Sequence, residues 1–330
     1  MPQTTVLIPN YNGIDYIEGC IESIRRAGDY PIVIVDNGSC DGSREVIEAH
    51  LSGEAAPAYN DIELIPLAEN TGFCHAVNAG LEKIKTEYVF LLNNDTTITP
   101  DTISALEKRM DSDPRIFAVQ SKILSMSDPD VIDDSGDLYC ALGWAFTPGK
   151  GKSAEAYSRP CKVFACCGAA VLYRMSAFDD VGNFDEEHFA YLEDIDIGYR
   201  ARIMGYRNVY EPSSVIFHAG SAVSGSRYNR FKVNLAAQNS IYIIYKNMPL
   251  VQFILNLPLL LIGFLIKTLF FSLKLMGFTY LRGLLRGFKL CGKDIKNGHR
   301  NKVWFRPRYL GRYALIQFEL WVNTVRRFAG

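Results

Sequence analysis

Three acidic side chains lie within four residues of one another in the segment YLEDIDIGYR. Carboxylates this close repel one another, which raises the pKa of at least one of them and suits it to act as a general base. Asp196 and Arg200 are four residues apart, and we expect them to form an ordinary ion pair on one face of a helix. Glu193 and Asp194 have no equally obvious partner. They are therefore the predicted catalytic pair.

A second carboxylate stands where an apolar run stops. Residues 87–100, EYVFLLNNDTTITP, run from Tyr88 to Leu92 and then into Asn93, Asn94 and Asp95. A turn closed by Asn and Asp side chains is the ordinary explanation. The alternative is a site for Mg²⁺ or Mn²⁺, which prefer oxygen ligands and often need only one or two carboxylates beside phosphate oxygens. Such a metal would neutralise a departing diphosphate.

Two further side chains follow apolar runs. Asp36, in VDNGSCDGS, can accept hydrogen bonds from a base or ribose, or form an Asx turn with Gly38. His218, in VIFHAGS, can ligate a metal or contact a phosphate. The first strand is followed by neither G-x-x-x-x-G-K-[ST] nor G-x-G-x-x-G. A P-loop kinase and an ordinary dinucleotide enzyme are therefore both disfavoured.

The elements that must position these residues alternate between strand and helix. Four apolar runs each lead into a segment with apolar residues at helical spacing; they lie at 4–9, 31–36, 62–67 and 88–92. This alternation predicts a parallel, doubly wound α/β sheet, whose ligands bind at the carboxyl ends of the strands. The polar ends PNYN, VDNGS and NNDT should therefore meet at one edge. Further on, FAVQSKI, KVFACCGAAVLYR and SVIFHAG are predicted strands.

The charge of the chain is divided unequally along its length. The formal net charge is −1, but residues 1–245 carry −14 and residues 246–330 carry +13. A basic segment of this kind points to a polyanionic partner, either nucleic acid or an anionic membrane surface. Nucleic acid is the weaker candidate, because the aromatic residues of this region lie in long apolar runs.

The basic region begins with residues 247–266, which carry no charge. A membrane-spanning helix needs about 20 apolar residues. A single crossing, however, would place the basic remainder outside the cell, against the positive-inside tendency. We therefore expect a surface-lying or re-entrant segment; the basic residues that would meet anionic lipid are Lys267, Lys274, Arg282, Arg286, Lys289, Lys293 and Lys296. The alternative is a helical bundle packed on the catalytic domain or on a dimer partner. Four glycines, at 277, 283, 287 and 292, argue against one unbroken helix.

Cysteine usage and the N-terminus bear on the cellular compartment. The eight cysteines form no C-x-x-C pair, and neighbours 166 and 167 cannot easily bridge, so reduced and mostly buried thiols are expected. The sequence MPQTTVLIPNYNG lacks the basic and apolar regions of a signal peptide. We therefore expect the catalytic part to lie in the cytoplasm.

Taken together, these segments resemble family 2 glycosyltransferases, which have the GT-A fold. The resemblance covers residues 4–225 and is closest to bacterial rhamnosyltransferases of surface-polysaccharide assembly; its motifs are IPNYNG, VDNGSCDGS, NTGFCHAVNAG, LLNNDT, CGAAVLYRMSAFDDVGNFDE and YLEDIDIGYR. It implies a Rossmann-like, mostly parallel sheet flanked by helices. It divides the chain into a catalytic domain, 1–245, and a helical, membrane-associating region, 246–330. Within the first, residues 1–115 would bind nucleotide and 116–245 would bind the acceptor.

The resemblance also implies a role for individual residues. The nucleotide-binding residues would be Pro9, Asn10, Asn12, Asp36, Asn70, Gly72, Asn78 and Asn94. Asp95 matches the last acid of the family's D-x-D motif and would bind Mg²⁺ or Mn²⁺, with His218 nearby. Asp194 matches the catalytic base of the family's E-D pair, with Glu193 before it. The sequence departs from the motif at Asn93, where many relatives have the first Asp, so one metal carboxylate is offered instead of two.

The activity implied is transfer of a sugar with inversion, from a nucleotide-diphosphate donor to a hydroxyl of a polyprenyl-diphosphate-linked saccharide at the cytoplasmic face of the membrane. Rhamnose from dTDP-rhamnose is the first expectation for the sugar. The alternatives are a UDP-sugar-dependent transferase (galactofuranose, glucose or similar) and a non-catalytic membrane scaffold that binds nucleotide sugars. A nucleotidyltransferase is disfavoured, because IPNYNGIDYIEG holds no Lys or Arg for a triphosphate. A homo-oligomer is compatible with all of these.

Overall fold

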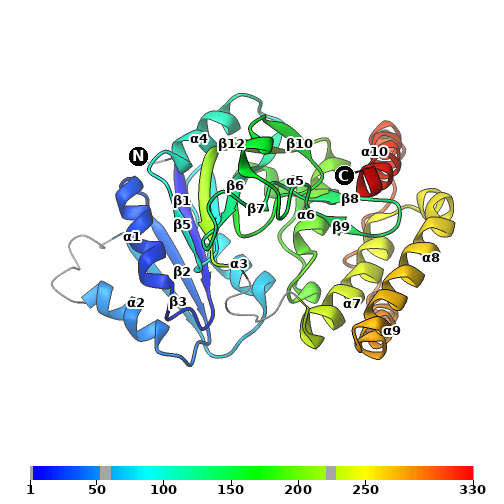
Figure 1. The fold of residues 1–330 in the computed structure, drawn as a ribbon, viewed down its shortest axis with the longest axis horizontal. Helices are drawn as coiled ribbons and strands as arrows, with labels where there is room; N and C mark the ends of the chain where they lie inside the picture. Colours follow the sequence, from blue (N-terminus) through cyan, green and yellow to red (C-terminus); the bar gives the residue numbers. More distant parts are fainter. Residues whose placement is uncertain (1–2, 53–60, 221–227, 330) are drawn as a thin grey trace.

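A mixed sheet forms the centre of the computed structural model, which describes residues 3–52, 61–220 and 228–329 (Figure 1). Residues 221–225, at the end of the predicted resemblance, lie outside the described part. The strand order is β10-β12-β6-β11-β4-β1-β2-β3, with β5 paired to β12 and β7 to β6. The strands are β1 (Thr4–Asn10), β2 (Ile32–Asn37), β3 (Ile62–Leu67), β4 (Tyr88–Leu92), β5 (Thr96–Ile98), β6 (Ile116–Ser125), β7 (Ile132–Asp134), β10 (Cys161–Val163), β11 (Ala170–Arg174) and β12 (Arg207–His218). A short hairpin, β8 (Leu138–Tyr139) and β9 (Ala145–Phe146), stands apart from this sheet.

The parallel half of the sheet confirms the predicted doubly wound arrangement. β1 runs parallel to β2 on one side and to β4 on the other, and β2 runs parallel to β3. In this register Asn10 is the Cα partner of Asp36. The connecting helices are α1 (Ile17–Ala27), α2 (Ser43–Ser52), α3 (Phe73–Leu81) and α4 (Thr102–Asp111). Because parallel strands end at the same edge, the predicted polar strand ends do come together.

The second half of the sheet differs from the prediction: β7 was not expected, β12 begins at Arg207, before SVIFHAG, and one predicted strand is divided. KVFACCGAAVLYR, expected as one strand, forms two: β10 pairs with β12 at the sheet edge, and β11 lies antiparallel between β4 and β6. Phe164 and Ala165, between these strands, are at 0% exposure, whereas Cys161 and Lys162 of β10 are exposed. A continuous apolar run therefore hid the break. The helices of this half are α5 (Phe178–Val181) and α6 (Glu193–Met204).

Four long helices complete the chain on one side of the sheet (Figure 1). They are α7 (Arg230–Asn247), α8 (Leu250–Leu273), α9 (Gly277–Lys296) and α10 (Leu310–Ala329). The expectation that Lys267 to Lys296 do not form one unbroken helix is confirmed, since α8 ends at Leu273 and α9 begins at Gly277, although the three later glycines lie inside a continuous α9. A Cβ at Gly283 would lie 2.5 Å from the Asn234 carbonyl oxygen, and one at Gly287 would lie 2.6 Å from that of Gln238. These glycines let α9 approach the backbone of α7.

The uncharged helix α8 packs one face on the rest of the chain and leaves the other exposed. Its buried polar residues, Gln252 and Asn256, are bonded to Tyr199 of α6 and Gln317 of α10. In the described part of the chain, α8 is the helix long and apolar enough to cross a membrane, and 17% of its most apolar window is buried. The bundle expected as the alternative is therefore present, and it carries a large exposed apolar face.

Candidate active site

Side chains from three strand ends join in one buried network. Asn94 Nδ2 donates to Asn10 Oδ1 at 2.7 Å, and Asn10 Nδ2 donates to Asp36 Oδ1 at 2.9 Å. The other Asp36 oxygen accepts a hydrogen bond from the Ser39 amide. All three predicted residues are nearly inaccessible to solvent, with Asp36 at 0% exposure. The network fixes the three loops relative to one another at the carboxyl edge of the sheet.

The other residues predicted to bind nucleotide lie on the loops around this network, with one exception. Pro9 is the β1 partner of Val35. Asn12 Oδ1 accepts from the Cys40 amide at 3.0 Å, and Asn70 Oδ1 accepts from the Gly72 amide at 3.0 Å. Gly72 has φ +95°, a backbone conformation that glycine adopts without strain.

Asn78 is the exception, because its amide is already engaged elsewhere. Its Nδ2 donates to the Phe184 carbonyl at 2.8 Å and to Glu186 Oε1 at 2.9 Å, and its Oδ1 accepts from the Phe184 amide. These contacts tie α3 to the segment before α6. These contacts indicate that Asn78 positions that segment.

Asp95 and His218, predicted as a metal pair, are neighbours. His218 Nε2 lies 3.2 Å from Asp95 Oδ1, and His218 Nδ1 lies 2.7 Å from Asp133 Oδ2. β12 brings His218 there by pairing with β5, which follows Asp95 directly. Burial alone would lower the pKa of His218, but its contacts with the carboxylates of Asp133 and Asp95 raise it to about 9. The imidazole is therefore positively charged at neutral pH.

One oxygen of Asp95 is a candidate metal ligand that faces His218. Asp95 Oδ1 is buried and, among the described residues, makes no hydrogen bond of good geometry, although His218 lies within ion-pair distance. A buried carboxylate oxygen without a hydrogen bond is costly unless a cation or another donor satisfies it. The carboxylate oxygen fits Mn²⁺ or Mg²⁺, and His218 Nε2 could join it as a ligand only in its neutral form. No group of three or more His, Cys, Asp or Glu side chains with metal-binding geometry occurs in the described ranges.

The predicted catalytic pair begins helix α6 and lies in an acidic environment. Asp194 lies beside Asp137, with which it can share a hydrogen bond when one of the two carboxyls is protonated, and Thr147 Oγ1 donates to both Asp137 and Asp134, at 2.8 and 3.0 Å. Burial, followed by the charge of Glu193, raises the pKa of Asp194 above its ordinary range. Burial likewise raises the pKa of Glu193. An elevated pKa is the property that a carboxylate base needs near neutral pH.

Asp196 has a different role from its two neighbours. It forms the predicted ion pair with Arg200, with Nε 3.0 Å from Oδ2, and also binds Lys246 and Asn247 of α7. Burial alone would raise the pKa of its carboxyl, but Lys246 and Arg200 hold it well below its usual range. Asp196 is therefore a permanent anion that joins α6 to α7.

The loop that presents the catalytic pair is strained. Phe189, Tyr191 and Leu192 all have positive φ, between 61° and 69°, a conformation that costs a non-glycine residue about 1–3 kcal/mol. Asn239 of α7 holds this loop by donating from Nδ2 to the carbonyls of His188, Ala190 and Tyr191, at 2.9, 3.0 and 2.7 Å. The ring of Phe189 also packs against Gly72, because a Cβ at that position would lie only 2.7 Å from the ring. The loop thus joins the nucleotide half to α6.

One segment that sequence reasoning left unassigned connects the two charged sites. Asp133 binds His218, and Asp137, four residues later, binds Asp194. Four residues span at most about 14 Å between their Cα atoms, so this segment brings the Asp95–His218 pair and the predicted catalytic pair into the same part of the molecule. The available signal was three acids within five residues in IDDSGD, which follow a predicted strand. Their partners are far away in sequence, so the signal could not be interpreted without the fold.

This fold and site define a sugar-transferring enzyme. The chain belongs to glycosyl transferase family 2, whose profile matches residues 5–182. It is therefore a nucleotide-sugar-dependent glycosyltransferase. The N-acetylglucosaminyl-diphospho-decaprenol L-rhamnosyltransferase of Mycobacterium tuberculosis is 28% identical over 242 residues, which cover 64% of this chain and 75% of that protein. The poly-beta-1,6-N-acetyl-D-glucosamine synthase of Staphylococcus aureus is 26% identical over 212 residues, 63% of this chain and 48% of that protein.

Solved structures agree on the fold. TarS 1–349 of S. aureus, in complex with UDP-GlcNAc, superposes with a TM-score of 0.58 at 16% identity, covering 90% of this chain and 83% of that one. The mannosyltransferase PcManGT of Pyrobaculum calidifontis, in complex with GDP-Man and Mn²⁺, gives 0.54 at 19% identity, covering 97% and 85%. At these identities the likeness concerns the GT-A fold alone, which confirms the predicted fold class.

Proposed function

We propose that the protein is an inverting glycosyltransferase that moves a sugar, rhamnose from dTDP-rhamnose as the first choice, to a hydroxyl of a polyprenyl-diphosphate-linked saccharide in cell-surface polysaccharide synthesis. The observation that carries the reaction type is the placement of Asp133 and Asp137 on one short segment, in contact with His218 and Asp194 respectively. The groups that would neutralise the phosphate therefore lie in the same region as the carboxylate that would act as the base. The name of the mycobacterial relative supports the choice of sugar and acceptor.

In the proposed reaction Asp194 is the general base. It takes the proton of the acceptor hydroxyl as that oxygen forms a bond to the anomeric carbon, while the bond from this carbon to the diphosphate oxygen breaks on the opposite face. The nucleoside diphosphate leaves with the bonding electron pair. Base assistance of this kind contributes about 10²–10⁴-fold to the rate. Glu193 raises the basicity of Asp194 through its own negative charge.

Asp95 and His218 are proposed to face the diphosphate. When bound at Asp95 Oδ1, with His218 Nε2 as a second ligand only after it has lost its proton, Mg²⁺ or Mn²⁺ would supply neutralisation of the leaving group's charge. His218 as an imidazolium would contact the same phosphates directly, and its pKa of about 9 favours that state. In both cases Asp133 orients the imidazole by binding Nδ1. We propose that the nucleotide pocket is formed by the predicted residues Pro9, Asn10, Asn12, Asp36, Asn70, Gly72 and Asn94. Asn78, the remaining predicted residue, is proposed to be a positioning residue.

The C-terminal helices are proposed to lie on the cytoplasmic face of the membrane. The exposed residues of α8 are apolar except Ser272, and the turn to α9 places Leu273 and Leu275 at 86% and 90% exposure. Because α8 is bonded through Gln252 and Asn256 to the rest of the chain, a surface-lying position fits better than an independent span. We propose residues 1–245 as the catalytic part and 246–330 as the membrane-associating part. Lys246 and the packing of α9 on α7 join the two.

Donor binding tests this function. Thermal unfolding would be measured against dTDP- and UDP-sugars, each with and without Mn²⁺ or Mg²⁺. A donor at 100 times its Kd should add about 2.7 kcal/mol to the free energy of unfolding. A shift with dTDP-rhamnose supports the proposal. A shift with UDP-sugars alone would mean that the donor is a UDP-sugar instead of dTDP-rhamnose. No shift with any donor would contradict a nucleotide-sugar site.

A further inference from the structure

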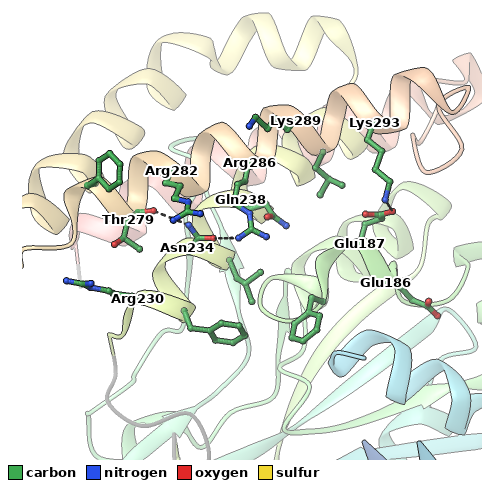
Figure 2. Close-up of a pocket in the computed structure, with 15 residues that line it drawn as sticks. Glu186, Glu187, Arg230, Asn234, Gln238, Thr279, Arg282, Arg286, Lys289 and Lys293 are labelled. Carbon is green, nitrogen blue, oxygen red and sulfur yellow. Dashed lines mark hydrogen bonds and ion pairs between the residues drawn. The ribbon is translucent and has the colours of Figure 1, made fainter. Parts of the chain in front are cut away.

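A basic groove lies between α7 and α9, beside the loop that leads into α6 (Figure 2). Its volume is about 1040 Å³. Five cationic side chains line it: Arg230 from α7 and Arg282, Arg286, Lys289 and Lys293 from α9. From the sequence, the four basic residues of α9 were expected only to contact anionic lipid in general. Their arrangement around a groove is a property of the fold.

Most of this positive charge has no partner within the described chain. The two carboxylates of the groove are already paired, Glu187 with Lys293 at 2.6 Å and Glu186 with His75 at 3.0 Å. Arg286 donates to Asn234 Oδ1. Arg230, Arg282 and Lys289 make no ion pair or side-chain hydrogen bond with any described residue. Three free cations along one groove complement a ligand with several negative oxygens, such as a phosphate or diphosphate.

The two ends of the groove differ in character. At one end Phe278, at 82% exposure, lies beside the apolar turn that holds Leu273 and Leu275. At the other end the groove is lined by Glu187 and Phe189, and Phe189 is five residues before Asp194. Helix α9 runs along the groove from Thr279 at the first end to Lys293 at the second (Figure 2). The groove therefore leads from the proposed membrane side towards the proposed catalytic base.

We propose that this groove binds the diphosphate of the lipid-linked acceptor, with Arg230, Arg282 and Lys289 on its oxygens, the prenyl chain leaving past Phe278 into the membrane and the saccharide directed towards Asp194. This inference rests on the proposed function for the identity of the acceptor. The charge complementarity and the apolar exit select a phosphate-bearing lipid over a free phosphate, which would need no exit. Asn239 and the strained loop after Phe189 connect the occupied groove to the position of the base.

The test compares two double variants with equal loss of charge. Arg282→Ala with Lys289→Ala removes two groove cations. Arg300→Ala with Arg306→Ala removes two exposed arginines of the same C-terminal region that do not line the groove. Binding would be measured to phosphatidylcholine vesicles that carry a long-chain polyprenyl diphosphate, and to vesicles with phosphatidylglycerol at the same surface charge. Free inorganic diphosphate would be added as a competitor.

The wild type and the arginine control should prefer the polyprenyl diphosphate vesicles by at least about tenfold, since each charge-assisted contact is worth about that factor. The groove variant should lose this preference but keep the wild-type thermal midpoint and its donor-induced shift. A groove variant that keeps the preference would overturn the proposal, as would a wild type that binds both vesicles equally. Competition by free diphosphate without any vesicle preference would also overturn it. A wild type that prefers the polyprenyl diphosphate vesicles but shows no donor-induced thermal shift would instead reject the proposed function. The assignment of the groove to a lipid-linked diphosphate would then still hold.

Discussion

Lys246 of α7 lies with its Nζ 2.9 Å from Asp196 Oδ2 of α6, and both side chains are buried. The same ammonium group binds Asp185 at 2.7 Å. This contact joins the C-terminal helices to the helix that carries the proposed base. It also separates the three clustered acids by role, because Asp196 is neutralised by Lys246 and Arg200. Glu193 and Asp194, three and two residues earlier, keep the raised pKa that suits catalysis.

The metal-dependent part of donor binding should depend on Asp95. Asp95→Asn replaces the free carboxylate oxygen by a neutral amide, so the extra thermal shift that Mn²⁺ adds to the donor should disappear. Turnover should fall about 10²–10³-fold, the usual effect of losing one charge-stabilising group. Asp101→Asn, at an exposed position six residues later, is the control and should behave as wild type. An Asp95→Asn enzyme with an unchanged Mn²⁺ response would place the metal elsewhere.

The two acids at the start of α6 should differ in their effect on catalysis. Asp194→Asn cannot accept the acceptor proton, so kcat should fall about 10²–10⁴-fold while the donor-induced thermal shift remains. Glu193→Gln removes the charge that raises the pKa of Asp194, so the acidic limb of the pH–rate profile should move to lower pH. Exposed Asp179→Asn serves as the control. Wild-type turnover in Asp194→Asn would show that another group is the base.

Asn239 should act as a positioning residue. Asn239→Ala removes three hydrogen bonds from carbonyls of the loop at 188–191, at a cost of about 1–3 kcal/mol for buried acceptors left unsatisfied. We expect kcat to fall about tenfold or more, with donor affinity unchanged. Ser240→Ala, which removes only a bond back to the Ala236 carbonyl, is the matched control. If donor affinity and kcat fell together in Asn239→Ala, the residue would be serving general stability instead.

Buried Asp134 should make the folded protein less stable as the pH rises. Burial, followed by the charge of Asp137, raises the pKa of Asp134 to about 8. Between about pH 4 and pH 8 the folded state therefore holds a proton that the unfolded state has lost, and the free energy of unfolding falls with pH across this range. Asp134→Asn keeps a neutral group of the same shape, and its amide can donate to the Thr147 hydroxyl, which then donates only to Asp137.

The measurement for Asp134 is the thermal midpoint of both proteins at pH 5 and pH 8. Asp134→Asn should exceed the wild type by roughly 3–6 °C at pH 8 and by much less at pH 5. Exposed Asp179→Asn provides the comparison at both values of pH. An equal difference at pH 5 and pH 8 would mean that Asp134 is ionised in the folded protein.

Membrane association should depend on the turn between α8 and α9. Leu273→Asp with Leu275→Asp puts two charges on side chains that pack against nothing in the described chain, so folding should be preserved. The protein should then move from the vesicle-bound to the free fraction on flotation, because each buried apolar side chain lost is worth about 1.5–3 kcal/mol. Ser104→Asp with Ser112→Asp adds the same charge at two exposed positions, on α4 and directly after it. Equal release by both variants would indicate a purely electrostatic effect.

The sequence by itself determined the alternation of strands and helices, the polar strand ends and the separation of Asp196 from Glu193 and Asp194. Each of these depends on residues close together in the chain: a hydrophobic period, a strand that stops at Asn93, or an ion pair four residues apart. The N-terminal half of the sheet could therefore be predicted strand by strand. A continuous apolar run, as between β10 and β11, could not reveal where one strand stops, because the connection is also buried.

Only the tertiary structure decided which distant groups meet. Asp133 reaches His218 across 85 residues of sequence, and Asn239 reaches the loop at 188–191 across about 50. No local period encodes such contacts, since they follow from the order of strands in the sheet and from the packing of α7. The same holds for Gly283 and Gly287, which by propensity weaken a helix but here permit the close approach of α9 to α7. That packing converts a basic stripe into a groove beside the proposed active site.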